Sequence, residues 1–210
     1  TSNTSLAIDT NNAVKDSTND ETLTIDATGM SVGVTLDASD DTDAKFVIKG
    51  GSGDDTITGS SSANAGDTIT GGAGNDVISF AQAKLTSADS VDGGAGANTI
   101  RFDDDELTSG SVAGIVDADF TGVTNIQTLT AAADKDIDYS LGSLAAAAGV
   151  TSVVLTGDAS SDLDSVTLLA GFTNDLTIDL DADTVNSTGN TIDATAYTKS
   201  LTVTALTSEI

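Results

Sequence analysis

The chain has 210 residues and a formal net charge of -26 at pH 7, from 33 acidic and 7 basic side chains. Repulsion between like charges disfavours nucleic acid and anionic membranes as partners. The chain contains neither Cys nor His, which excludes disulfide frameworks, cysteine nucleophiles, Ser-His-Asp triads and His-ligated zinc. We therefore expect a protein that is not an enzyme.

The acidic residues are almost all Asp, since only Glu21, Glu106 and Glu209 are Glu. Asp favours turns whereas Glu favours helices, so this bias predicts acidic turns and cation ligation. No apolar run approaches the length of a transmembrane segment, and no cleavable signal sequence is visible. The chain begins at Thr1 and not at Met, so we expect a processed form or a fragment.

Short strand-like runs come first along the chain, at residues 23–26, 34–36 and 46–48. Apolar and polar residues alternate within such runs, as half-buried strands require. Similar runs return at residues 153–155, 166–168, 176–180, 191–193 and 201–203. The absence of Pro suits long parallel ladders, and an aromatic content of 3% suits a narrow interior filled by aliphatic side chains. These runs predict solenoid coils over residues 1–49 and 102–210.

A glycine-rich block occupies residues 50–101. Residues 50–58 and 71–79 both fit the pattern Gly-Gly-x-Gly-x-Asp-x-apolar-x, a nonapeptide typical of calcium-binding parallel β-helices. A turn that offers several backbone carbonyls needs residues free to adopt positive φ, which glycine does without steric cost. One carboxylate per turn then completes the all-oxygen shell that Ca²⁺ prefers.

Three weaker copies of the nonapeptide stay in phase with the intact ones. Residues 93–101 keep the glycines but carry Asn98 in place of the carboxylate, which predicts weaker binding. Two degenerate copies keep the register through Asp67 and Asp89. The separations along Asp55, Asp67, Asp76, Asp89 and Asn98 are 12, 9, 13 and 9 residues, so two linking turns carry insertions.

We predict that Ca²⁺ is the cofactor and that these turns hold it. The predicted metal-binding residues are Gly51, Gly53, Asp54, Asp55, Asp67, Gly72, Gly74, Asn75, Asp76, Asp89, Gly94, Gly96 and Asn98. The alternative interpretation is a set of flexible Gly/Asp turns without metal, which the phase between copies disfavours.

The nonapeptides resemble the RTX repeats of secreted bacterial proteins, over roughly a quarter of the chain. The resemblance implies a right-handed parallel β-roll, type I secretion and folding on contact with extracellular calcium. In such a roll two nonapeptides make one coil, so alternate turns stack. We expect the best ion between Asp55 and Asp76, a second between Asp76 and Asn98, and a third, weaker position between Asp67 and Asp89.

Three stretches interrupt the strand pattern and predict short helical insertions. Residues 81–88 form a helical or looped insertion between calcium turns, and residues 107–120 hold a turn or two of helix. Residues 140–149 favour helix through two Leu residues and four successive Ala residues. No linker rich in Gly or Ser divides the chain, so we expect one elongated all-β solenoid domain over residues 1–210.

A second resemblance concerns residues 121–130, which contain Val-Thr-Asn-Ile-Gln-Thr-Leu. This segment is similar to Val-x-Asn-Ile-Glu-Thr-Leu segments beside RTX repeats in surface-layer proteins of Gram-negative bacteria. The resemblance implies the assembly domain of a calcium-dependent surface-layer protein, with cell-surface attachment through another domain.

The expected function is therefore a secreted, extracellular structural protein that forms a homo-oligomer or polymer when calcium drives folding. Three alternatives remain. The chain is the stalk or ligand-binding segment of a large RTX adhesin, an ice-binding variant with a flat threonine face, or the repeat portion of a secreted RTX enzyme. Thr-x-Thr runs favour the ice-binding variant, but Ser79 and Arg101 interrupt the file of threonines.

Overall fold

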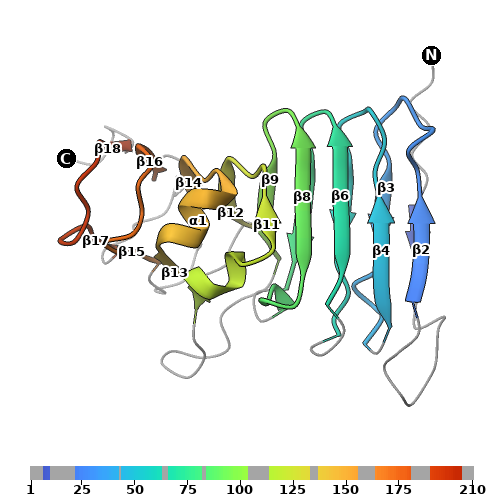
Figure 1. Ribbon diagram of the computed structural model, residues 1–210, viewed down its shortest axis with the longest axis horizontal. Coiled ribbons are helices and arrows are strands. Elements are labelled where there is room, and N and C mark those ends of the chain that lie inside the picture. Colours follow the sequence, from blue (N-terminus) through green and yellow to red (C-terminus); the bar gives the residue numbers. More distant parts are fainter. Residues whose placement is uncertain are drawn as a thin grey trace.

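The computed structural model describes residues 7–9, 22–42, 44–62, 66–81, 84–103, 114–132, 137–155, 164–180 and 190–204. Almost all of these residues lie in, or connect, parallel β-strands that wind into a solenoid (Figure 1). The all-β parallel solenoid predicted from the sequence is therefore confirmed. Predicted coils that fall on residues 1–6 and 10–21, and in the later gaps, lie outside the described residues.

One sheet, here called the long sheet, runs through the whole described part of the chain. Its nine strands follow the order β1 (Ala7–Asp9), β3 (Thr35–Asp37), β5 (Thr56–Thr58), β7 (Val77–Phe80), β9 (Thr99–Phe102), β12 (Thr128–Ala131), β14 (Ser152–Val154), β16 (Leu176–Asp179) and β18 (Leu201–Thr204). Every pairing between neighbours is parallel, with one strand contributed by each coil.

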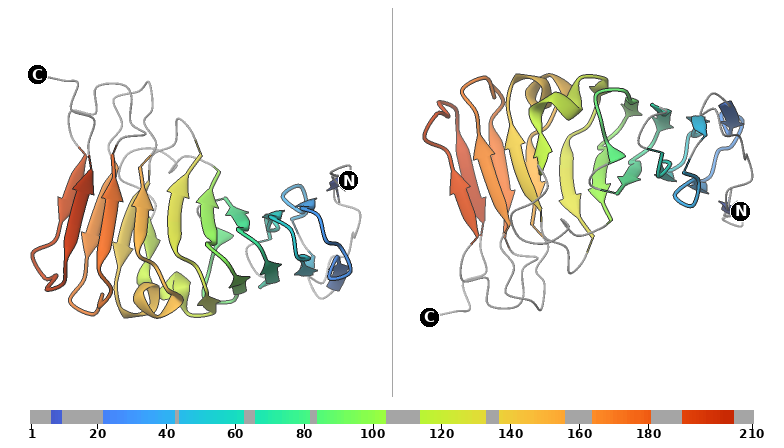
Figure 2. Two further views of the ribbon diagram at one scale, coloured as in Figure 1. Left: turned by 90° about the horizontal axis from the view of Figure 1, so that it is seen from above. Right: turned by 90° about the horizontal axis from the view of Figure 1, so that it is seen from below.

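Two shorter sheets face the long sheet in succession. The N-terminal sheet has the order β11 (Val123–Thr124), β8 (Ser90–Ala95), β6 (Thr68–Ala73), β4 (Lys45–Lys49) and β2 (Thr22–Asp26). The C-terminal sheet has the order β10 (Ile115–Val116), β13 (Asp138–Leu141), β15 (Ser165–Leu168) and β17 (Thr191–Asp193). Figure 2 shows the two halves of the solenoid from above and below, with β2 and β18 toward opposite ends.

The coils of the glycine-rich block have the length that the motif spacing predicts. Asp55 and Asp76 occupy equivalent positions 21 residues apart, and Asp76 and Asn98 lie 22 residues apart. Two nonapeptides with an insertion of three or four residues give these lengths, so the prediction of two nonapeptides per coil is confirmed.

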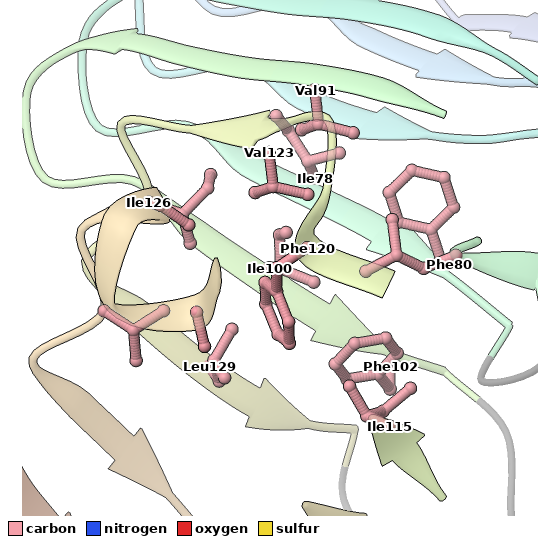
Figure 3. Packing of buried hydrophobic residues seen from close by; sticks show 14 of the residues in the cluster. Ile78, Phe80, Val91, Ile100, Phe102, Ile115, Phe120, Val123, Ile126 and Leu129 are labelled. Carbon is pink, nitrogen blue, oxygen red and sulfur yellow. The ribbon is translucent and has the colours of Figure 1, made fainter. Parts of the chain in front are cut away.

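The core is a file of aliphatic side chains that point inward from the long sheet. Leu36, Ile57, Ile78, Ile100, Leu129, Val153 and Ile178 each have 0% exposure. In six of these strands the residue lies between two half-buried or exposed residues, which is the period-two pattern of a sheet with one solvated face. The exception is β7, where Ser79 next to Ile78 is also buried. Ile48, Ile69 and Val91 complete the core from the N-terminal sheet. Figure 3 shows part of this core, with Ile78, Ile100 and Leu129 of the long sheet and Val91 of the N-terminal sheet.

One coil joins the two shorter sheets. It contributes β10 to the C-terminal sheet and β11 to the N-terminal sheet, with the 3-10 helix η2 (Asp117–Phe120) between them. The helix α1 (Ser143–Ala148) packs against η2, β11 and β13. Phe120 and Ile126 are buried at this junction (Figure 3). The helix therefore covers the point at which one short sheet gives way to the other.

The predicted helical insertions have three outcomes. The helix predicted within residues 140–149 is confirmed as α1, which ends at Gly149 with φ 107°. Of residues 107–120, the described part contains η2, whereas 107–113 lie outside the described residues. Of residues 81–88, the described part forms turns in which the Lys84 N–H donates to the Ala81 carbonyl; residues 82–83 lie outside the described part. None of the described helices is long and apolar enough to cross a membrane.

Candidate calcium-binding turns

The intact nonapeptides form turns at one edge of the solenoid, where the chain passes into the long sheet. We call this the leading edge, and its turns at residues 50–55, 71–76 and 93–98 precede β5, β7 and β9. The opposite edge, where the chain leaves the long sheet, is the trailing edge and contains Asp67 and Asp89. The structure therefore confirms that alternate turns stack.

Glycine is required at the leading edge by both backbone angle and space. Gly72 has φ 120° and Gly96 has φ 130°, a region that residues with a side chain rarely adopt. A Cβ atom at Gly72 would overlap the carbonyl oxygen of Gly51, and one at Gly96 would overlap that of Gly74. The glycines thus bring the carbonyl of one coil against the backbone of the next. In the described part of the chain, the turn at 50–55 has no positive φ, so only the two later turns have the predicted conformation.

Buried side chains form a ladder of hydrogen bonds along the leading edge. The Val34 N–H donates to Oδ1 of Asp55 at 2.8 Å, and the Asp55 N–H donates to Oδ1 of Asp76 at 2.8 Å. The Asp76 N–H donates to Oδ1 of Asn98 at 3.0 Å, and the Asn98 N–H donates to Oε1 of Gln127 at 2.7 Å. Each side chain accepts a backbone N–H from the preceding coil, so the ladder fixes the register between coils.

The second carboxylate oxygen distinguishes Asp76 from the other acids of the motif. Oδ2 of Asp55 accepts the Gly51 N–H at 2.7 Å, whereas Oδ2 of Asp76 is buried and has no hydrogen-bond donor among the described residues. A Cβ atom at Gly71 would run into this oxygen and would lie 2.6 Å from the Gly93 carbonyl oxygen. The two oxygens therefore border the same small space.

A buried carboxylate oxygen that faces a carbonyl oxygen needs a cation or a proton between them, because unpaired buried charge is costly. Ca²⁺ takes oxygen ligands from carboxylates and backbone carbonyls, so the residues present fit this ion. The residues that would hold it are Asp76, through Oδ2, and Gly93, through its carbonyl oxygen. Gly93 was not among the residues predicted from the sequence.

The electrostatics of Asp76 agree with a cation site. Burial raises the pKa of the Asp76 carboxyl above its ordinary value of 3.8, and the charges of Asp55 and Asp54 act in the same direction. The hydrogen bond from the Asp55 N–H opposes this rise. A bound divalent cation would relieve both the burial and the repulsion.

The trailing edge has the predicted pairing of Asp67 with Asp89, but its carboxylate oxygens are occupied. Asp67 accepts the Phe46 N–H at 2.9 Å and the Ser60 N–H at 2.8 Å, one on each oxygen. Asp89 accepts the Asp67 N–H at 2.7 Å and the Thr86 N–H at 2.8 Å. These two carboxylates therefore cap backbone N–H groups, and every oxygen already has a donor.

Asp54 and Asn75 lie on the outside of the leading edge. The Asn75 N–H donates to Oδ1 of Asp54 at 2.7 Å, and the Ala97 N–H donates to Oδ1 of Asn75 at 2.8 Å. This exposed ladder runs in the opposite direction to the buried one. Among the residues that the structure describes, no group of three or more acidic side chains is placed so that it could hold a metal ion by itself. That arrangement agrees with one carboxylate per turn and further ligands from the backbone.

Sequence reasoning missed the continuation of these ladders outside the glycine-rich block. The Ile137 N–H donates to Oδ1 of Asp164 at 2.8 Å, and the Asp164 N–H donates to Oδ1 of Asn190 at 3.2 Å. A signal was present, because Asp164 precedes Ser-Val as Asp89 does, while Asn190 precedes Thr-Ile as Asn98 does. An acid or amide before Ser or Thr and an aliphatic residue thus marks the ladder without any glycine.

Acidification is expected to stabilise the calcium-free protein. Burial is the main cause that raises the pKa of Asp76, Asp67 and Asp119 above 3.8. A folded-state pKa above the unfolded value means that the folded state binds more protons, so stability falls as pH rises through this window. Thermal melts in chelator should therefore shift upward as pH drops from 7.5 toward 4.5. An unfolding midpoint that falls steadily over this range would contradict the burial of these carboxyls.

Comparison with known families identifies the repeats. The sequence model of the RTX calcium-binding nonapeptide repeat, in four copies, matches residues 47–78 and 86–108. These residues include all three leading-edge turns and both trailing-edge acids described above. RTX repeats bind calcium and are typical of secreted extracellular proteins, so calcium is the cofactor of this part of the chain. Comparison with curated proteins and with solved structures yields no match.

Proposed function

We propose that this chain is a structural protein, without enzymatic activity, that leaves the cell by type I secretion and assembles into an extracellular surface layer or filament. In this proposal, calcium orders the leading-edge turns, and the ordered solenoid then adds to another copy. The observation that carries the proposal is the pair of matching strand edges at the two ends of the described residues. Attachment to the cell surface would use another domain.

The last described coil leaves both of its strands open on one side. Within the described part of the chain, β17 and β18 are edge strands of their sheets. Val203 continues the inward file after Ile178 but is 45% exposed, whereas Ile178 has 0% exposure. An unpaired strand over an uncovered apolar side chain is a template for another strand. The proposal assigns this surface to a second copy of the chain.

The first described coils present a matching surface. β1 and β2 are edge strands of the long sheet and the N-terminal sheet among the residues that the structure describes. Leu23 and Ile25 are only half-buried, although their pairing partners Phe46 and Ile48 are buried. The last strand of one copy's long sheet can therefore continue the first strand of the next. Such a head-to-tail contact does not close on itself and generates filaments.

Calcium would control this assembly through the order of the coils. Glycine-rich turns lose the most backbone entropy on folding, and the acids of the motif repel one another without a cation. In a solenoid each coil packs only on its neighbours, so disorder in the block between β4 and β9 separates the two ends. Folding of the block would join the N-terminal and C-terminal coils into one continuous solenoid to which another copy can add.

The assembly proposal is tested by Val203→Asp, with Leu169→Asp as the matched control. Leu169 is exposed to a similar extent, 41%, but lies in a turn after β15 and not in the inward file of the last coil. Calcium should increase the particle size of the native chain in sedimentation and produce ordered filaments or sheets in electron micrographs. Val203→Asp should abolish this growth, and Leu169→Asp should retain it.

Two results would overturn the proposal. The first is a native chain that folds with calcium but stays monomeric, which is the behaviour of an adhesin stalk. The second is growth that both variants retain equally. The ice-binding alternative gains little support, because the long sheet pairs Thr58 with Ser79 and Ser79 with Arg101, which interrupts the outward file of threonines.

A further inference from the structure

We propose that Asn98 replaces a calcium ion with its own amide group and so ends the ladder of calcium sites at turn 93–98. This inference rests on calcium binding by the RTX repeats and is independent of the assembly proposal. It concerns the same position in successive leading-edge turns, where an atom of the motif side chain meets a carbonyl oxygen of the next coil.

In the two earlier turns, a carboxylate oxygen of the motif Asp lies close to a carbonyl oxygen of the next coil. A Cβ atom at Gly50 would run into both Oδ2 of Asp55 and the carbonyl oxygen of Gly71. One coil later, a Cβ atom at Gly71 would meet Oδ2 of Asp76 and the carbonyl oxygen of Gly93. Carboxylate and carbonyl oxygens repel each other when no hydrogen or cation lies between them. Oδ2 of Asp55 already accepts the Gly51 N–H at 2.7 Å, whereas Oδ2 of Asp76 has no donor among the described residues, so the position at Asp76 favours a cation most strongly.

At turn 93–98, the side-chain amide nitrogen of Asn98 takes the place of the carboxylate oxygen and faces a carbonyl oxygen of the next coil. A Cβ atom at Gly93 would lie 2.7 Å from Nδ2 of Asn98 and would also run into the carbonyl oxygen of Asn125. Nδ2 of Asn98 donates to the Asn125 carbonyl at 3.0 Å and to the Gly94 carbonyl at 3.4 Å. The amide thus supplies the hydrogens that complete the contact between coils.

The orientation of this amide is fixed by its partners. Oδ1 of Asn98 accepts the Asp76 N–H at 3.0 Å, which leaves the NH₂ group to face the two carbonyls. Both ends of the side chain are therefore hydrogen-bonded, and the group that faces the carbonyls is an NH₂ donor, which does not bind a metal. The ladder then continues to Gln127, which is also uncharged. The buried ladder therefore begins with two carboxylates, of Asp55 and Asp76, and continues with two uncharged amides, of Asn98 and Gln127.

A side-chain amide also joins coils further along the leading edge, from a different turn position and toward the preceding coil. Nδ2 of Asn174, in the turn between β15 and β16, donates to the carbonyls of Ala146 at 2.8 Å and Val150 at 3.0 Å. This turn has no nonapeptide and no calcium motif. Side-chain NH₂ groups therefore satisfy carbonyls at this edge in coils that lack a cation.

The reciprocal exchange of Asp76 and Asn98 tests the proposal. Asp76→Asn keeps an acceptor for the Asp55 N–H and places an NH₂ group against Gly93, as Asn98 does against Asn125. It should reduce the calcium stoichiometry in titration calorimetry by one and raise the unfolding midpoint in chelator. Asn98→Asp loses two donors and sets a carboxylate against two carbonyls. It should lower the midpoint in chelator and add one calcium ion.

A control variant separates this effect from a general change of charge. Asp37→Asn removes one exposed charge while keeping the acceptor that Ser39 uses, and it lies away from the leading edge. It should leave the calcium stoichiometry unchanged, with a midpoint shift in chelator smaller than that of Asp76→Asn. The expected shift for Asp76→Asn is an increase of about 2–4 °C, corresponding to one satisfied buried group in a chain of this length.

The outcomes also separate this proposal from a purely structural role for Asn98. If Asn98→Asp is destabilised in chelator and binds no additional calcium, the amide is an ordinary hydrogen-bonding group and the proposal fails. If Asp76→Asn binds as much calcium as the native chain, Asp76 is not the ligand and the proposal also fails. Neither result depends on whether the protein forms filaments.

Discussion

Removal of calcium at neutral pH is expected to lower the unfolding midpoint by about 5–10 °C. The site at Asp76 contributes roughly 2–3 kcal/mol when calcium is in about hundredfold excess over its dissociation constant. For a chain of this length each kcal/mol corresponds to about 2–4 °C. The cause is electrostatic, because Oδ2 of Asp76 has no donor and Asp54 and Asp55 repel it.

Circular dichroism melts in excess calcium and in excess chelator measure this difference. Magnesium is the matched control, because it demands a smaller octahedral shell and gives up its water reluctantly. It should restore little of the midpoint that chelation removes. Equal midpoints with calcium and with chelator would show that the turns are stable as metal-free Gly/Asp loops, the interpretation that the phased repeats disfavour.

Substitution of Gly96 by Ala is expected to destabilise the calcium-bound protein by roughly 2–5 kcal/mol, from backbone strain together with overpacking. Gly96 has φ 130°, and a Cβ atom there would overlap the carbonyl oxygen of Gly74 in the preceding coil. The new methyl group would push the two turns apart and misplace the carbonyls that face the metal. Calcium affinity should therefore fall together with stability.

Gly29→Ala is the matched control for this substitution. Gly29 is exposed, its φ lies outside the positive region, and a Cβ atom there would meet nothing within 4 Å. Denaturant unfolding in calcium should show a loss for Gly96→Ala and little change for Gly29→Ala. Similar losses in both variants would mean that removing glycine flexibility, and not the close stacking of turns, limits stability.

Much of the fold follows from two periodicities in the sequence. Alternation of apolar and polar residues located most strands of the long sheet, since each inward side chain lies between two outward ones. The phase of the acids predicted which turns stack, because Asp55, Asp76 and Asn98 fall on one edge and Asp67 and Asp89 on the other. Both signals are local, so a single sequence carries them.

The change from the N-terminal to the C-terminal sheet could not be predicted in this way. The strands β10 and β11 have two residues each, which is too short for any periodicity to appear. Their assignment to different sheets depends on η2 and α1, which pack against one another over the buried Phe120. Such contacts join residues far apart in the chain and leave no pattern in a short window.

The sequence also could not predict which motif Asp residues bind metal and which only accept hydrogen bonds from backbone N–H groups. Asp55, Asp67, Asp76 and Asp89 are the same residue type at the same motif position. Their second oxygens differ because the Gly51 N–H points at Asp55, whereas the positive φ of Gly72 belongs to a turn in which Asp76 receives no such donor. The backbone conformation at the glycine determines whether its N–H points at the carboxylate. Glycine adopts positive and negative φ about equally, so its presence in the sequence does not predict that conformation.

The segment at residues 121–130 acquires a physical role in the structure. Asn125 adopts φ 56°, the one positive φ among the described non-glycine residues. Its Nδ2 donates to Oδ1 of Asp92 at 2.8 Å, while Gln127 accepts the Asn98 N–H. The segment thus connects the last RTX turn to the coil at the junction of the two shorter sheets.

Hydrogen exchange with and without calcium tests most directly the claim that calcium bridges successive coils at the leading edge. The amide N–H groups of Asp55 and Asp76, which donate to the buried ladder, should exchange much more slowly with calcium, as should those of β5, β7 and β9. Amides of β15 and β16, in coils without nonapeptides, should change far less. Protection that rises equally in both regions, or that calcium does not change, would contradict the account.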